Sequence, residues 1–129
     1  MTLEEAREFF GNDKYATVAT GVVIDSVEPG RSVCSLKLTD NHRNALGAVM
    51  GGVFYTLCDF AFAVATNDRE HSTVTVTSQI SYLSVAKGDT LYATASPIKD
   101  GRRSCFYEVK VTDNLGTLVA VAMTNGMHL

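Results

Sequence analysis

Apolar and polar residues follow a helical period at the start of the chain and then change to alternation. Residues 2–10 place their apolar side chains on one side of a helix, and Thr2 and Glu5 have the spacing of a capping box. A strand pair is predicted between residues 19 and 39, interrupted by the turn sequence Glu28-Pro29-Gly30. Its second arm alternates apolar and polar residues, which predicts a hairpin with one solvated face.

The next segment, residues 45–67, carries a single charged residue, Asp59. Such a segment either spans a membrane or forms a buried helix. We predict a buried helix over 51–67, because glycines cluster at its start and a carboxylate stands in its middle. One span among strand-like segments also makes no membrane topology. A helix that is apolar on all sides must be surrounded by other elements.

Four alternating segments follow the helix, and they are predicted to be strands: 72–83, 90–98, 102–112 and 117–125. The separators between them are short, which predicts consecutive strands as antiparallel neighbours. A helix over 51–67 is about 25 Å long and an eight-residue strand about 26 Å, so the helix fits lengthwise on a sheet. This order of elements is that of an α+β hot-dog fold, an antiparallel sheet wrapped around a long central helix, although another α+β sandwich fits the pattern too.

Composition narrows the class of protein. The chain has 129 residues, of which 46% are hydrophobic and 19% charged, so disordered, collagenous and low-complexity architectures are excluded. We expect a single domain over 1–129. The formal net charge of −3 argues against a general binder of nucleic acid or anionic membranes. Three cysteines in unrelated contexts and a start without a secretion signal predict a cytoplasmic protein.

Asp59 is the first candidate for chemistry. An unpaired carboxylate on an apolar, buried helix is costly. It therefore either pairs with a backbone turn or a distant arginine for structure alone, or serves as a general base or nucleophile with a tuned pKa. Gly51 and Gly52 stand where the helix begins, and their N–H groups are suited to a developing oxyanion. A double glycine is also common in ordinary turns.

The distance between these two features carries a further consequence. Eight residues separate Gly51 from Asp59, which is about 12 Å along one helix and too far for both to touch one carbonyl. If both serve one reaction, one of them must come from an antiparallel copy of the helix in a second subunit. We therefore expect the function to require a dimer.

The stretch HRNALGAVMGGV at 42–53, followed by Leu57-Cys58-Asp59, resembles the hot-dog thioesterases of the phenylacetate-pathway type. Their signature is H-x-N-x-x-G-x-x-H-G-G, with an acidic residue eight positions after the first paired glycine. The resemblance extends over about residues 21–126. It implies hydrolysis of an acyl-CoA thioester to acid and thiol by a homo-oligomer, a dimer or a dimer of dimers, with active sites at the subunit interface.

The resemblance also implies roles for single residues. Asp59 is the base or nucleophile, and the Gly51 amide polarises the thioester carbonyl. Asn44 braces the loop or the substrate carbonyl. Thr75 lies where the family has a Ser or Thr that positions the attacking water or the carboxylate, but a strand-favouring residue on a solvated face fits it equally. The residues expected to contact substrate are Met50, Gly52, His42, Lys99, Arg102 and Arg103.

Met50 departs from the family, which has a histidine before the paired glycines. A thioether donates no hydrogen bond, and loss of a donor to the thioester carbonyl or departing sulfur typically costs about 3 kcal/mol. Met50 could instead shape an apolar pocket for an acyl chain. The departure leaves open a non-catalytic acyl-CoA or fatty-acyl binding module on the same fold. A hydratase or dehydratase would need a paired histidine and acid near the helix start, where only His42 is available.

Lys99, Arg102 and Arg103 put three positive charges around one turn of an acidic protein. They either hold the phosphates of coenzyme A or form a solvated hairpin tip. No metal site is expected, because the histidines lack the spacing of zinc-ligand motifs: His42, His71 and His128. We expect no cofactor apart from the coenzyme A that the substrate carries.

Overall fold

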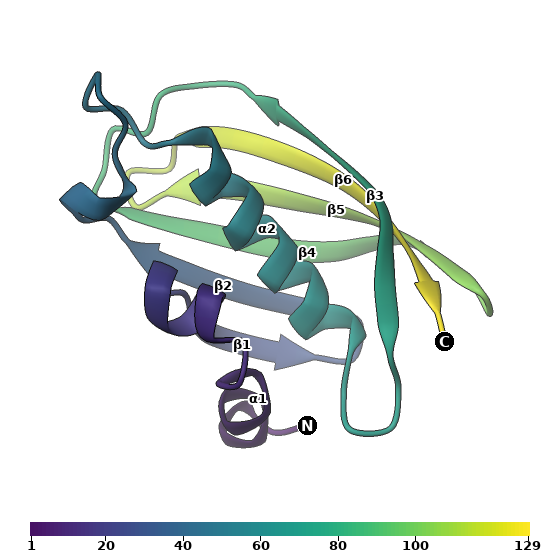
Figure 1. Cartoon of the computed structure of the whole chain (residues 1–129). Coiled ribbons are helices and arrows are strands. Elements are labelled where there is room, and N and C mark those ends of the chain that lie inside the picture. The colour runs from purple at the N-terminus through teal and green to yellow at the C-terminus, as the bar shows by residue number, and fades with distance from the viewer.

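A six-stranded antiparallel sheet and one long helix lying across it form the body of the protein (Figure 1). The computed structural model describes all of residues 1–129. In chain order the elements are α1 (Leu3–Phe10), a π-helical turn (Tyr15–Thr20), β1 (Val23–Glu28), β2 (Arg31–Lys37), a 3-10 turn (Asp40–His42), α2 (Gly51–Thr66), β3 (Thr73–Tyr82), β4 (Thr90–Asp100), β5 (Ser104–Asp113) and β6 (Leu118–His128).

The predicted helices and strands are confirmed, with shifts at their ends. Thr2 caps α1 and accepts a hydrogen bond from the Glu5 N–H over 3.2 Å, as the capping-box spacing predicted. The strand pair begins later than predicted, because the chain first makes a π-helical turn that ends at Gly21 with φ 92°. Only glycine adopts such an angle without strain, so the turn ends there and β1 follows.

Consecutive strands were predicted to pair with each other, and this prediction is wrong for β3 and β4. The sheet order is β1-β2-β4-β5-β6-β3, so β3 lies at an edge beside β6 while β4 lies between β2 and β5. The seven residues 83–89 therefore cross the ends of two strands and form no tight turn.

The buried carboxylate of Asp113 holds this crossing segment in place. It accepts hydrogen bonds from the N–H groups of Lys87 and Gly88 over 2.8 and 3.0 Å. Its other oxygen accepts from Leu115 and Thr117 over 3.0 and 2.9 Å. Burial alone would raise the pKa of Asp113, but the four backbone donors outweigh it and lower the pKa.

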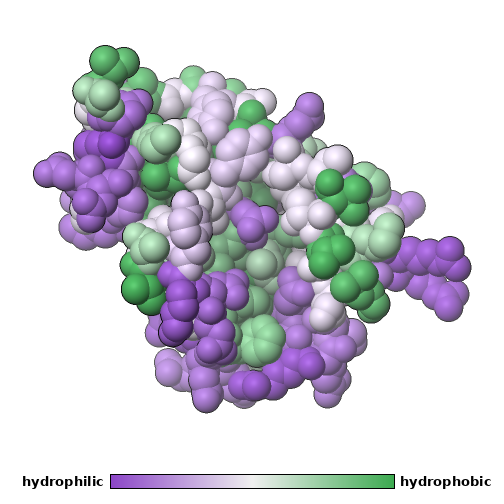
Figure 2. Space-filling model, in the orientation of Figure 1, coloured by the Kyte–Doolittle hydropathy of each residue, from purple (hydrophilic) through white to green (hydrophobic).

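α2 packs on the concave face of the sheet through its apolar side. Its buried residues are Phe54, Leu57, Cys58, Phe60, Ala61, Phe62, Val64 and Ala65. The predicted sheet around a long helix is confirmed, but in the single chain one side of the helix stays open, since Gly52, Tyr55 and Asp59 are exposed there. Figure 2 shows this open side, where pale and green side chains mix over the helix. Neither α-helix has the length and apolar character that a membrane span requires.

β3 forms one boundary of the sheet. One side of β3 pairs with β6 over its whole length, and its outer edge has no partner strand in the chain. Most of its residues are exposed, among them the apolar Val74 and Val76. The open side of α2 and the free edge of β3 are thus both uncovered in one chain.

Candidate active site

Asp59 lies midway along the open side of α2, in a cavity of about 530 Å³. Tyr15 and Ala16 of the π-helical turn, Tyr55 and Ala63 of α2, and Ser78 of β3 contribute to the walls. The prediction that Asp59 is buried is wrong for the single chain, in which this residue is exposed. The reason is geometric: the sheet covers the opposite side of the helix, and only the cavity shields the carboxyl group.

The surroundings of Asp59 raise its pKa above the usual range for aspartate. Partial loss of water in the cavity is the largest cause, and the negative charge of Asp13 adds to it. The Thr75 hydroxyl, close enough to act as a donor to the carboxylate, opposes both and lowers the pKa. A raised pKa makes the carboxylate a stronger proton acceptor, as a general base requires. Sequence reasoning missed Asp13, since nothing in the local pattern connects it with Asp59, 46 residues further along the chain.

Thr75 is the threonine of β3 that faces Asp59. Two other threonines of this strand alternate in the same way but use their hydroxyls elsewhere. Thr73 donates to the Thr66 carbonyl over 3.0 Å, and Thr77 donates to the Asn125 side chain. The structure therefore brings Thr75 and Asp59 together from two different elements.

α2 begins at Gly51, and the N–H groups of Gly51 and Gly52 donate to no acceptor in the chain. These free donors stand at the positive end of the helix dipole. The Tyr82 hydroxyl donates to the Gly51 carbonyl over 3.0 Å and so orients this first turn. A Cβ at Gly52 would meet nothing, so the space beside this residue is open. Met50, 58% exposed, precedes them as the N-cap residue.

The loop before α2 is braced by its own polar side chains. Asn44 Oδ1 accepts from the N–H groups of Leu46 and Ala48 over 3.0 and 3.1 Å, which is the bracing of the loop rather than of a substrate. His42 is only 6% exposed. Its Nδ1 accepts from the Thr39 N–H over 2.9 Å, and its Nε2 donates to the Thr20 carbonyl over 2.7 Å. Both ring nitrogens are occupied within the chain, so His42 has no nitrogen free for a substrate or for the acid–base pair of a hydratase.

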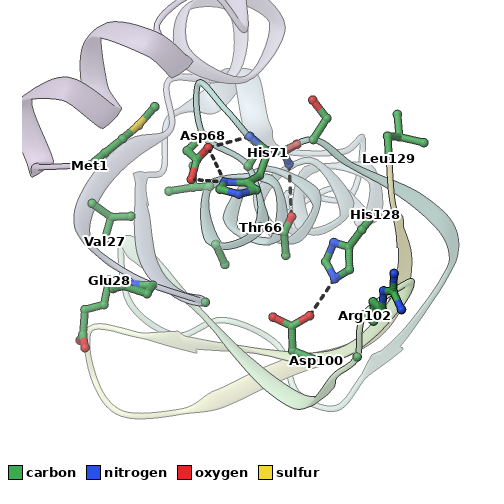
Figure 3. A pocket seen from close by; sticks show the side chains of 17 residues that line it. Met1, Val27, Glu28, Thr66, Asp68, His71, Asp100, Arg102, His128 and Leu129 are labelled. Carbon is green, nitrogen blue, oxygen red and sulfur yellow. Dashed lines mark hydrogen bonds and ion pairs between the residues drawn. The ribbon is translucent and has the colours of Figure 1, made fainter.

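The basic cluster lies far from Gly51 in one chain. Lys99, Arg102 and Arg103 are exposed around the tip between β4 and β5. Arg102 borders a second cavity, at the C-terminal end of α2 (Figure 3). The two ends of this sixteen-residue helix are separated by about 22 Å. A single chain thus does not bring these cations to the helix start.

Comparison with known proteins gives consistent matches. The profile of the Thioesterase superfamily matches residues 46–120. Human acyl-coenzyme A thioesterase 13 is 33% identical over 103 residues, which cover 77% of this chain and 74% of that protein. Acyl-coenzyme A thioesterase PaaI of Escherichia coli is 29% identical over 119 residues, covering 92% and 84%. The solved structure of the E. coli PaaI protein from the phenylacetic acid degradation operon superposes with a TM-score of 0.89 at 27% identity, covering 98% and 91%.

Proposed function

The chain belongs to the thioesterase superfamily, has its hot-dog fold and hydrolyses acyl-CoA thioesters, and from this premise we propose how its residues perform the reaction. Asp59 and Thr75 of one subunit act on a thioester whose carbonyl oxygen is held by the Gly51 N–H of a second subunit. The observation that carries the proposal is the Asp59 carboxylate, which lines a cavity large enough for an acyl group and has the Thr75 hydroxyl beside it. The non-catalytic alternative that Met50 left open is set aside, because the relatives are named as acyl-CoA thioesterases.

The reaction needs a proton acceptor and an oxyanion donor. With Thr75 orienting a water, the Asp59 carboxylate takes a proton from it while the water oxygen attacks the thioester carbon. The carbonyl oxygen becomes an oxyanion and accepts hydrogen bonds from the free amides at the start of α2. The C–S bond then breaks, and the sulfur leaves with the proton that Asp59 carries. Direct attack by Asp59, with hydrolysis of the resulting anhydride, uses the carboxylate in the same place.

A two-fold dimer would bring Gly51 of one subunit close to Asp59 of the other. Gly51 and Asp59 of one chain are about 12 Å apart along the helix, so one α2 cannot bring both to a single carbonyl. An unpaired, exposed edge such as that of β3 favours pairing with another strand. Two β3 edges that pair antiparallel set the two copies of α2 side by side in opposite directions. Asp59 of one subunit then lies toward Gly51 of the other.

The same arrangement supports a role for the basic cluster. With Asp59 of one subunit beside Gly51 of the other, the C-terminal end of each α2 extends about 10 Å past the partner's Gly51. The hairpin with Lys99, Arg102 and Arg103 thereby approaches the partner's Gly51 from the outside, where the phosphates of a bound coenzyme A emerge. One arginine side chain can donate to two oxygens of the same phosphate, whereas lysine offers a single point charge. Arg102 and Arg103 are therefore stronger candidates than Lys99.

Complementation between two inactive variants tests the shared site. Asp59→Asn removes the base and Gly51→Pro removes the N–H donor, and the two proteins are co-produced in equal amounts. In mixed dimers one site keeps Asp59 and Gly51 and the other has lost both. With half of the dimers mixed, about one quarter of the parent rate returns. Thiol release is measured with short, medium, long and aromatic acyl-CoAs, which also identifies the acyl class. Mixed dimers without activity, formed from two dimeric variants, would refute a site shared between subunits.

A further inference from the structure

The second cavity, of about 550 Å³, lies at the C-terminal end of α2 and is lined by Asp100 and His128 (Figure 3), with the buried Cys105 close behind them. Asp100 ends β4 and is paired across the hairpin with Cys105 of β5. Cys105 is in turn paired with Gly126 of β6, two residues before His128. Because residues i and i+2 of a strand share a face, all three side chains lie on the concave side of the sheet. Their ligand atoms are within 4.8 Å of one another.

The hydrogen bonds around His128 determine which of its nitrogens carries hydrogen. Thr73 uses its single hydroxyl proton toward the Thr66 carbonyl, at 3.0 Å. Thr73 Oγ1 lies 2.8 Å from His128 Nδ1, so it accepts there and Nδ1 is protonated. This direction also excludes Thr73 as a nucleophile activated by His128.

The other nitrogen of the same ring faces a carboxylate. His128 Nε2 lies 2.7 Å from Asp100 Oδ1, the contact drawn in Figure 3. With Nδ1 donating to Thr73, Nε2 and the Asp100 carboxylate either form an ion pair or bind one metal ion between them. The thiol of Cys105 lies within 4.8 Å of both atoms and supplies the third donor that a metal site needs.

We propose that Asp100, Cys105 and His128 bind one divalent transition-metal ion, and that their mixed oxygen, sulfur and nitrogen donors select zinc. Tetrahedral zinc holds its ligands at about 2.0–2.3 Å, so the ligand atoms lie about 3.4–3.6 Å apart. The Asp100–His128 contact opens by about 0.7 Å to reach that spacing. The fourth position faces the cavity and takes a water molecule. This site is independent of the Asp59 chemistry.

Thr73 and Tyr107 offer hydrogen-bonding groups that a bound ion and its water would use. Thr73 accepts from the far nitrogen of His128, which is the outer hydrogen bond that fixes a ligating imidazole. Tyr107 follows Cys105 by two residues on the same face of β5 and is only 1% exposed, yet its hydroxyl has no hydrogen-bond partner. A Cβ at Gly30, which lines the same cavity, would come within 3.3 Å of that hydroxyl. A water bound to the ion would donate to this buried hydroxyl oxygen, which has no partner in the chain.

The site also joins parts of the fold that are distant in sequence. The ion would tie the ends of β4, β5 and β6 together and, through Thr73 and Thr66, to the last turn of α2. A matched control lies in the same cavity: Asp68 and His71 form a comparable pair at 3.0 Å, without a thiol. This pair is not expected to bind the ion.

The test is a titration of the full chain, first treated with a chelator, with Co²⁺ and then Zn²⁺. We expect one equivalent of Co²⁺, a thiolate-to-cobalt charge-transfer absorption, its loss when Zn²⁺ is added, and a Zn²⁺-dependent rise in Tm. Cys105→Ser removes the absorption, and Cys34→Ser, a change at another buried free cysteine, keeps it. Thr73→Val weakens Zn²⁺ binding about 10–100-fold, as expected for an outer-shell partner.

Other outcomes overturn the proposal. One is a wild-type chain that shows no cobalt–thiolate absorption. Another is an absorption that persists in Cys105→Ser or disappears in the Asp68→Asn, His71→Gln double variant. A loss of metal binding in a variant could also come from misfolding. For His128→Gln, the Tm measured without metal shows whether the variant is folded. If that variant folds and binds Zn²⁺ as tightly as the parent, the site is refuted.

Discussion

Replacement of Gly51 by proline isolates the oxyanion donor from every other property of the helix start. Gly51 is the first residue of α2, where proline is favoured and its fixed φ suits the helix. The preceding Met50 has φ −63° and ψ 136°, a conformation compatible with a following proline. The Gly51 N–H has no acceptor in the chain, so the fold loses no hydrogen bond when it is removed. Gly51→Pro therefore deletes one donor from a helix that keeps its shape.

The matched control is Gly51→Ala, which adds a Cβ but keeps the N–H. That Cβ would lie 3.1 Å from the Tyr82 hydroxyl, which stands at the far end of a 52% exposed side chain and can shift by a few tenths of an ångström. We expect this strain to be about 1 kcal/mol, or about fivefold in rate if it acts entirely on the transition state. Loss of one oxyanion donor is larger, about 2.7–4 kcal/mol or about 10²–10³-fold in kcat. The proline variant should thus be slower than the alanine variant by more than tenfold.

The assay is thiol release under saturating acyl-CoA, with kcat and KM determined separately and Tm measured for both variants. Because the donor acts on the oxyanion, the loss is expected in kcat with a smaller change in KM. Equal kcat values for the proline and alanine variants, at equal Tm, would show that the Gly51 amide does not hold the carbonyl oxygen.

Four further substitutions, at Asp59, Asp13, Met50 and Asp113, are expected to change activity or thermal stability. Asp59→Asn removes the base and lowers kcat by about 10²–10⁴-fold. The same substitution raises Tm at neutral pH, because the raised folded-state pKa of Asp59 means that its ionised form destabilises the fold. The gain in Tm disappears below the unfolded pKa of about 3.9, and a variant with parent-like turnover contradicts the assignment. Asp13→Asn removes a negative charge that raises the pKa of Asp59, so the acidic limb of the kcat/KM–pH profile moves to lower pH; an unmoved limb shows that this charge does not act on the base. Met50→His restores a donor before the paired glycines and is expected to raise kcat for thioester hydrolysis, with Met50→Gln as the control that donates without titrating. Asp113→Asn lowers Tm at neutral pH, and the deficit narrows as pH falls below the unfolded pKa, because the lowered folded-state pKa gives stability that is lost in acid; a pH-independent deficit would point to packing alone.

The local pattern of the sequence determined most of the elements and the location of the chemistry. Apolar spacing and the Thr2 cap identify α1, and alternation identifies every strand within a few residues of its ends. The glycines at 51 and 52 mark where α2 begins, and a lone acid in an apolar helix draws attention to Asp59. These features can be predicted because they depend on backbone geometry and side-chain polarity within one or two turns of chain.

Pairings between distant segments were decided by the tertiary structure. A short connection after β3 looks like a hairpin turn, yet β3 pairs with β6, because the whole length of both strands determines the register and seven residues suffice to cross two strands. The exposure of Asp59 depends on which side of α2 the sheet covers. His42 is occupied by Thr39 and Thr20, contacts that no spacing rule contains. Asp100, Cys105 and His128 meet only because β4 and β6 end where β5 begins, at one end of three adjacent strands, so a search for ligand spacing along the chain does not find them.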